Sequence, residues 1–146
     1  MIGQLDQARI RGLIPHDGAM CLLDAVLGWD ADSIRCTAAS HRDPGNPLRR
    51  GGRLSAVCAI EYAAQAMALH GALTAQAGER ARPGMLASVR DARCHVSRLD
   101  AIRGDLTIAA QRLLSEGTRV IYGFTVDGEG RRLAEGRAAV VLGARD

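Results

Sequence analysis

The sequence contains no lysine, so all 19 residues counted as Lys+Arg are arginines. Only four aromatic residues occur, and they are scattered along the chain: Trp29, Tyr62, Tyr122 and Phe124. Single-stranded nucleic acids are bound by aromatic stacking platforms beside a basic track. Here the arginines are interleaved with 16 acidic residues, and the net charge is only +3. We therefore expect no nucleic-acid partner.

Paired cysteine motifs are also absent. None of the four cysteines, Cys21, Cys36, Cys58 and Cys94, forms a Cys-x-x-Cys pair. This pattern argues against zinc and thioredoxin-type sites, and we expect no metal. No apolar run reaches the roughly 18 residues that a membrane-spanning helix needs, so we expect no membrane span. The first residues lack the pattern of a secretory signal, which favours a cytoplasmic protein.

What the sequence does contain is strong strand patterning. Its 146 residues suit a single domain, and we expect residues 1–146 to form it. Alternating apolar and polar side chains predict a hairpin over residues 21–29 and 33–38. They also predict four later strands, at residues 85–96 (with a bulge), 106–114 (interrupted by Arg112), 119–126 and 132–142. Tight turns between neighbouring strands indicate an antiparallel sheet.

The longest predicted helix lies between these two groups of strands. Residues 54–77 have high helix propensity, no proline and one charged residue, Glu61. A helix this apolar is expected to be buried on all sides, and its many alanines allow close approach to a neighbour. One long helix on an antiparallel sheet is an α+β fold. Six strands wrapped around such a helix make the hotdog arrangement, which we predict here.

Three segments carry a family resemblance. They read Ile14-Pro15-His16-Asp17-Gly18-Ala19-Met20-Cys21-Leu22-Leu23-Asp24, then Ile60-Glu61-Tyr62-Ala63-Ala64-Gln65-Ala66, then Ser88-Val89-Arg90-Asp91-Ala92-Arg93 followed by Arg103-Gly104-Asp105-Leu106. In this order they resemble segments of the hotdog-fold 3-hydroxyacyl-[acyl-carrier-protein] dehydratases. The resemblance is to the divergent branch encoded with aryl polyene biosynthesis. It covers nearly the whole chain, and the helix segment is its most specific part.

The chain departs from that family in the loop before the helix. The family carries Gly-His-Phe-Pro-Gly there, and its histidine is the catalytic base. This sequence has Asn46-Pro47-Leu48-Arg49-Arg50-Gly51-Gly52-Arg53-Leu54 instead. The nearest upstream histidine, His41, lies farther from Glu61 than the family spacing.

The resemblance implies site residues as well as a reaction. Glu61 takes the role of the helix carboxylate, and burial would raise its pKa so that it can donate a proton. Gln65, one turn further on the same face, is expected to support Glu61 through a hydrogen bond. His16 is the favoured substitute base, and the resemblance places it beside the acyl tunnel with Ile14 and Pro15.

Each of these assignments has a structural alternative. Glu61 can be a carboxylate held by donors near the helix start, and His16 can be a loop residue that positions the first strand. His41 is a weaker candidate for the base. His70 lies about 180° around the helix from Glu61, so we expect it to be structural. We assign no role to His95.

Arg49, Arg50 and Arg53 cluster just before the helix. Acyl carrier proteins are acidic, so we expect these arginines to bind the carrier or the phosphate of its phosphopantetheine. The alternative is a solvated loop face. With the substrate carried on that phosphopantetheine, we expect no other cofactor.

Three functions stay open at this point. The first is dehydration of carrier-bound 3-hydroxyacyl thioesters to trans-2-enoyl thioesters, in aryl polyene or fatty-acid-like biosynthesis. The second is a non-catalytic or half-site subunit whose paralogue supplies the missing histidine. The third is an acyl thioesterase, because other hotdog enzymes use a helix carboxylate to activate water. We expect a homodimer or a heterodimer, since the sheet otherwise leaves an open edge.

Overall fold

The computed structural model describes residues 4–14, 18–75 and 84–143. A short helix, α1 (Gln7–Leu13), precedes the hairpin of β1 (Ala25–Trp29) and β2 (Ser33–Ala38). The long helix α2 (Ala59–Thr74) follows. The chain then forms the strands β3 (Gly84–Cys94), β4 (Leu106–Glu116), β5 (Arg119–Gly128) and β6 (Arg131–Leu142). Short 3-10 turns cover Gly18–Met20, Ser40–Arg42 and Ala56–Cys58.

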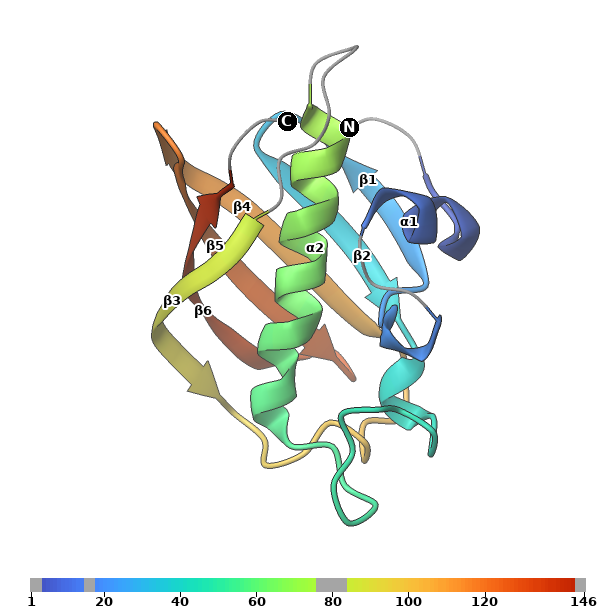
Figure 1. The fold of residues 1–146 in the computed structure, drawn as a ribbon. Coiled ribbons are helices and arrows are strands. Elements are labelled where there is room, and N and C mark those ends of the chain that lie inside the picture. The colour runs from blue at the N-terminus through green and yellow to red at the C-terminus, as the bar shows by residue number, and fades with distance from the viewer. Residues whose placement is uncertain (1–3, 15–17, 76–83, 144–146) are drawn as a thin grey trace.

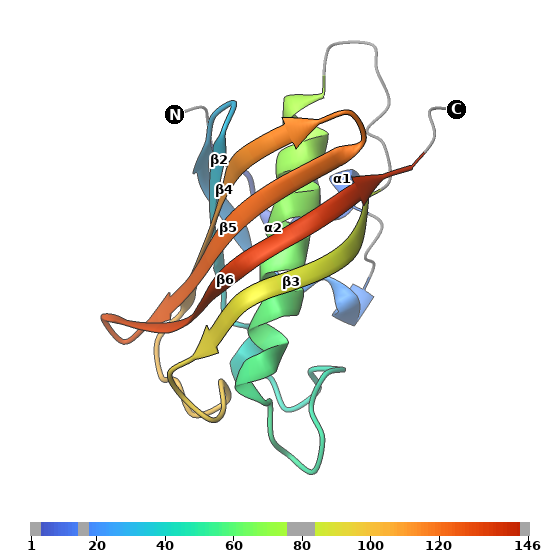
Figure 2. The same ribbon diagram turned by 90° about the vertical axis from the view of Figure 1, so that its left-hand side faces the viewer.

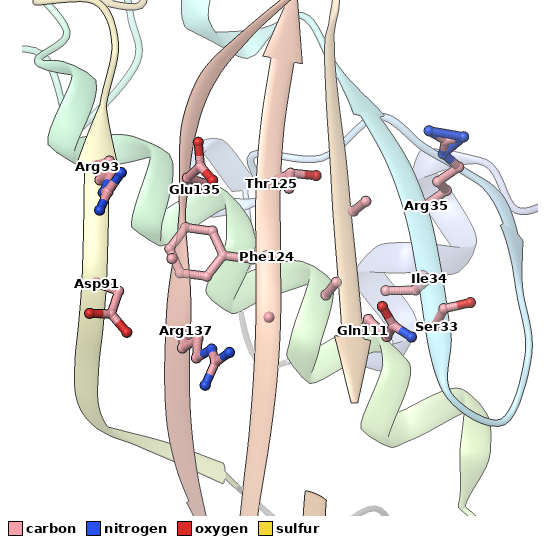
Figure 3. Close-up of a pocket in the computed structure, with 14 residues that line it drawn as sticks. Ser33, Ile34, Arg35, Asp91, Arg93, Gln111, Phe124, Thr125, Glu135 and Arg137 are labelled. Carbon is pink, nitrogen blue, oxygen red and sulfur yellow. The ribbon is translucent and has the colours of Figure 1, made fainter. Parts of the chain in front are cut away.

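The six strands form one antiparallel sheet in the order β1-β2-β4-β5-β6-β3. The sheet curves around α2, and α1 lies on the same side of it (Figures 1 and 2). This architecture confirms the predicted α+β hotdog fold. The opposite face of the sheet carries neither helix and is hollowed near its middle (Figure 3). No helix among the described residues is long and apolar enough to cross a membrane.

The core lies between α2 and the concave face of the sheet. On β5 the buried residues alternate with partly exposed ones, as the sequence pattern predicts: Val120, Tyr122, Phe124 and Val126. Opposite them, α2 buries Tyr62, Ala63 and Ala66. Small alanine side chains let the helix lie close to the strands, so the alanine-rich composition has a direct packing role here.

The first turns of α2 differ from the prediction. Residues 54–58 were expected to be helical, but the α-helix begins at Ala59, after a 3-10 turn capped by Ser55. The N–H of Leu54 donates to a carboxylate oxygen of Asp100 at 2.9 Å. The N–H of Ala56 donates to the carbonyl of Ser97 at 3.1 Å. These contacts with a distant loop satisfy N–H groups ahead of the helix and fix where it begins.

The sequence pattern did not predict α1. Its N-cap is Asp6, whose carboxylate accepts a hydrogen bond from the N–H of Arg9 at 3.0 Å. The first strand also begins later than predicted, at Ala25, because residues 18–20 form a 3-10 turn. The bulge predicted in residues 85–96 is confirmed, since the β3–β6 register shifts twice.

One face of α2 is uncovered, which corrects the prediction that the helix is buried all round. Val57, just ahead of the helix, and Glu61, Ala68 and Gly71 within it are exposed. These positions are separated by four, seven and three residues, so they fall on one face of the helix and form a stripe along it. The sheet of a single chain reaches only the opposite side. We call Val57, Glu61, Ala68 and Gly71 the open stripe.

His70 is structural, as its position on the helix predicts. Its side chain is fully buried, with Nε2 2.9 Å from the carbonyl of Asp30 and Nδ1 2.8 Å from the hydroxyl of Tyr122. A carbonyl only accepts, so Nε2 carries the proton and Nδ1 accepts from Tyr122. Burial lowers the pKa of His70 and raises the pKa of Tyr122 to about 12. The imidazole ties α2 to the β1–β2 turn.

Acidification is expected to destabilise the fold through His70. Because its folded-state pKa is lowered, the unfolded chain binds a proton that the folded chain does not. The associated stability is complete above the ordinary histidine pKa of about 6.5 and falls as the pH drops below it. Urea unfolding at pH 7.5 and pH 5 measures this loss. His70→Gln should show a smaller loss between the two pH values, and an unchanged loss would contradict the assignment.

Candidate functional site

Glu61 lies in the first turn of α2, on the open stripe. The burial expected for its carboxylate is not found, because the sheet covers only the other side of the helix. Among the described residues, no side chain is hydrogen-bonded or ion-paired to this carboxylate. Glu61 is therefore free to meet a substrate or a second subunit.

Gln65 is buried and does not bond to Glu61, which corrects the expected contact. Its carbonyl oxygen accepts from the N–H of Leu22 at 2.9 Å, and its amide nitrogen donates to the carbonyl of Met20 at 2.6 Å. The side chain is only 1% exposed. Gln65 thus fastens the chain that leads into β1 to the helix, one turn after Glu61.

His16 and Pro15 lie outside the described residues, so their proposed roles stay predictions. The residues on either side of them are placed. Ile14 is buried at the end of α1, where its N–H donates to the carbonyl of Ile10 at 3.2 Å. Met20, four residues after His16, is held by Gln65. The described residues on either side thus lie in the core, at Ile14, and beside α2, at Met20.

A buried chain of hydrogen bonds connects α2 to the segment before β1 and to the loop after β2, and no sequence pattern indicated it. The Ser40 hydroxyl donates to the carbonyl of Leu22 at 2.7 Å, so it accepts from the Tyr62 hydroxyl at 2.8 Å. Tyr62 in turn accepts from the side-chain amide of Asn46 at 3.2 Å. Burial raises the pKa of Tyr62, which keeps the hydroxyl protonated for this role.

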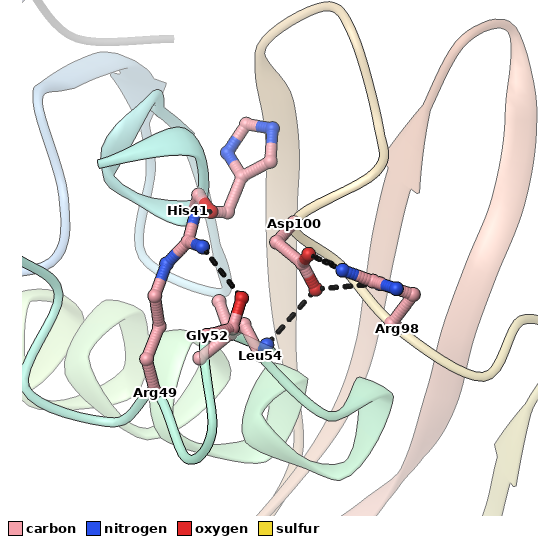
Figure 4. A network of polar contacts seen from close by, with 6 residues as sticks. All are labelled: His41, Arg49, Gly52, Leu54, Arg98 and Asp100. Carbon is pink, nitrogen blue, oxygen red and sulfur yellow. Dashed lines mark hydrogen bonds and ion pairs between the residues drawn. The ribbon is translucent and has the colours of Figure 1, made fainter. Parts of the chain in front are cut away.

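His41 is held in the loop interior. Its side chain is fully buried, and Nε2 lies 3.1 Å from the carbonyl of Ile102 (Figure 4 shows its surroundings). Nδ1 is buried without a hydrogen-bond partner among the described residues. Burial lowers the pKa of the imidazole, so the neutral form is favoured. A base must reach its substrate, and this geometry favours a structural role for His41 over the catalytic one.

The three arginines before the helix have different environments. Arg49 donates to the carbonyls of Gly52 at 2.9 Å and His41 at 3.0 Å, which closes the loop on itself (Figure 4). Arg50 donates to the carbonyls of Pro47 and Arg49. Arg53 is exposed, and its guanidinium has no partner in the described part of the chain. Of the predicted cluster, Arg53 is the one whose charge is fully available to a ligand.

A second loop braces the start of α2. The carboxylate of Asp100 accepts from the guanidinium of Arg98 and from the N–H of Leu54 (Figure 4). The ion pair holds the pKa of Asp100 well below its usual range. Arg42 also pairs with Asp105 of this loop at 2.9 Å. The chain before Glu61 is thus fixed from two directions.

The residues around Glu61 limit the chemistry of the site. Cys58, three residues earlier, has a raised pKa because its thiol is partly buried and lies near the Glu61 carboxylate. The thiol form is therefore favoured, which argues against a cysteine nucleophile. No group of three or more His, Cys, Asp or Glu able to hold a metal occurs in residues 4–14, 18–75 and 84–143. The available reactive group is a carboxylate suited to proton transfer.

Comparison with known families gave one match. Residues 8–144 match a family model described as ApeP-like, the ApeP dehydratase. Comparison of the sequence with curated proteins gave no match.

Solved structures with the same fold include dehydratases and thioesterases. The dehydratase heterocomplex ApeI:P from Xenorhabdus doucetiae matches with a TM-score of 0.80 at 24% identity, over 92% of this chain and 91% of that chain. Zebrafish thioesterase superfamily member 2 matches with a TM-score of 0.64 at 18% identity, over 94% and 95%. A Haemophilus influenzae thioesterase matches with a TM-score of 0.60 at 14% identity, over 82% and 77%. At these identities the structural likeness establishes the fold and not the substrate.

Proposed function

We propose that this chain, which belongs to the ApeP-like dehydratase family, dehydrates 3-hydroxyacyl thioesters carried on an acyl carrier protein. The product is the trans-2-enoyl thioester, in aryl polyene or fatty-acid-like biosynthesis. The observation that carries the proposal is the unpaired Glu61 carboxylate, placed in the first turn of α2 and open to a ligand. We expect the reaction to need no cofactor other than the phosphopantetheine of the carrier.

In the proposed reaction a base removes the proton from the α-carbon while the C–O bond at the β-carbon breaks. An acid delivers a proton to the departing hydroxyl, so that water leaves and the enoyl double bond forms. Glu61 is the proposed acid. The developing negative charge on the thioester carbonyl is favoured by the positive end of the α2 dipole. His16 stays the proposed base, with Ile14 and Pro15 beside the acyl chain.

We also propose that the working unit is a dimer, with a paralogous hotdog subunit as the favoured partner. The open stripe of α2 exposes Glu61 to a neighbour. Strand β3 is an edge of the sheet, and its Met85 is 74% exposed. An unpaired strand edge favours association with another chain. The Xenorhabdus relative is a heterocomplex, and no histidine among the described residues bonds to Glu61.

Hydration of a 2-enoyl-acyl carrier protein, the reverse reaction, tests the proposal. Loss of the enoyl thioester absorbance is followed with the purified protein alone and with a paralogous subunit added. Hydration by the protein alone or with the paralogous subunit supports dehydratase function. Hydration that occurs only with the paralogous subunit supports the heterodimer. Release of free thiol without hydration would instead assign a thioesterase.

Arg53 is the proposed contact for the acidic carrier protein. Arg53→Glu is expected to weaken carrier binding about tenfold or more at low salt, and the difference should shrink as salt screens the charges. The matched control is Arg103→Glu, because Arg103 is also exposed and lies in the loop between β3 and β4. Titration calorimetry at two salt concentrations measures both variants. Equal effects of the two substitutions would contradict a specific role for Arg53.

A further inference from the structure

The face of the sheet that points away from both helices carries a hollow that the proposed reaction does not use. Its volume is about 600 Å³. Its lining includes Ala109 and Gly123, which have no long side chains. Charged side chains from three strands also line it, as Figure 3 shows: Arg35, Asp91, Arg93, Glu135 and Arg137. We call this depression the outer hollow.

Two leucines stand beside the outer hollow because of a bulge in β4. The β4–β5 register shifts between Arg112 and Leu114, and Leu113 is the extra residue. A Cβ on Gly123 would lie 3.5 Å from Leu113, so this leucine borders the hollow. Leu114 pairs with Ile121, which points outward because the flanking Val120 and Tyr122 are buried.

Both leucines are therefore on the outer face, each 47% exposed. In a regular strand, neighbouring residues point to opposite faces, so one of the two would face the core. The bulge sends the second leucine outward instead. Exposed apolar side chains grouped next to a hollow are typical of an interaction surface.

The charges around the hollow are of both signs. Arg35, Arg93 and Arg137 have no hydrogen bond or ion pair within the described chain. Asp91 is also unpaired there, at a backbone φ of 55° within the β3 bulge. Glu135 is paired with His95 at 2.8 Å. The described part of this surface thus presents three unpaired arginines and one unpaired aspartate, together with a protrusion and a depression.

We propose that this face joins two copies of the chain around a two-fold axis. In such a contact the same patch meets itself, so that the leucines of each copy enter the hollow of the other. Free arginines of one copy can then meet Asp91 of the other. The contact leaves α2 and Glu61 open, because both lie on the other side of the sheet. The inference does not depend on the proposed reaction.

The mass of the purified full-length protein in solution tests the proposal. Light scattering on a sizing column is applied to the wild type, Gly123→Arg, Leu113→Arg and Leu13→Arg. Gly123→Arg fills the hollow, and Leu113→Arg places a further cation beside its arginines. Leu13 is the matched control, since it is 36% exposed at the end of α1, on the side of the sheet opposite the outer hollow (Figure 1). Circular dichroism checks that each variant is folded.

We expect the two outer-face variants to have half the mass of the wild type, and Leu13→Arg to keep the wild-type mass. Either outer-face variant is sufficient if the other fails to fold. Equal masses for all folded proteins would overturn the proposal. Loss of a paralogous subunit from Leu113→Arg, with no change in the mass of the protein alone, would assign the face to that subunit and also overturn it.

Discussion

Glu61→Gln is expected to lower kcat/KM for enoyl-thioester hydration by about 100-fold or more, the usual scale of one acid or base in a proton transfer. The amide has the shape of the carboxyl group but cannot exchange a proton with the substrate. Glu61 is exposed and has no partner in the described chain, so the free energy of unfolding should change by less than about 0.5 kcal/mol. The assay uses whichever assembly, the chain alone or its mixture with a paralogue, shows activity.

Glu129→Gln provides the matched control, because it makes the same chemical change in the turn between β5 and β6. Glu129 faces Arg131 at 3.9 Å on the surface, a pair expected to contribute little to stability. This variant should keep the wild-type rate. A rate for Glu61→Gln within twofold of the wild type would rule out the carboxylate as the acid. If Glu61→Gln instead lowers only the rate of free-thiol release, Glu61 acts in a thioesterase reaction.

The strands were predictable because their local pattern and their tertiary role agree. On β5 the alternation from Val120 to Val126 is the same alternation that the sheet requires, one face toward α2 and one away. The start of α2 was not predictable in the same way. Residues 54–58 have the composition of a helix, but Asp100 and Ser97 hold their N–H groups from a loop far along the chain. Propensity does not contain that information.

The site was partly predictable for the same reason. The resemblance singled out Glu61 and Gln65 as a pair on one helix, and spacing alone suggested that they touch. In the structure the Gln65 side chain is hydrogen-bonded to the backbone of Met20 and Leu22, and helical spacing cannot reveal these partners. Likewise Arg49 and Arg53 are equivalent in the sequence. Only the fold shows that Arg49 is committed to loop carbonyls and that Arg53 is free.

The exposure of Glu61 has a consequence for its chemistry. An apolar helix with one charge suggested full burial and a raised pKa, but the single chain covers only the side of α2 that faces the sheet. Ala68 and Gly71 extend the open stripe with side chains small enough for a second helix or strand to lie close. If a partner covers this stripe, the carboxylate is desolvated only in the assembly. The acid role proposed for Glu61 would then depend on association with a partner.

Gln65→Leu is expected to destabilise the fold by about 2 to 4 kcal/mol, because it leaves one buried and one partly buried backbone group without partners. The N–H of Leu22 loses its acceptor and the carbonyl of Met20 loses its donor. Leu22 is only 1% exposed, so water cannot replace the lost bond without opening the structure. Urea unfolding measures the change. Activity should fall as well, because the segment that contains His16 loses its attachment to α2.

Two further variants separate these effects. Gln65→Glu has nearly the same shape, and its protonated carboxyl can still accept from Leu22 and donate to Met20. Its ionised form loses the donor and buries a charge, so this variant should be less stable at high pH than at low pH. Gln4→Leu makes the same polar-to-apolar change at an exposed position and should alter stability by less than about 0.5 kcal/mol. If Gln65→Leu is as stable as Gln4→Leu, the two hydrogen bonds do not hold the segment. If it is unstable but fully active at low temperature, Gln65 supports the fold and does not position His16.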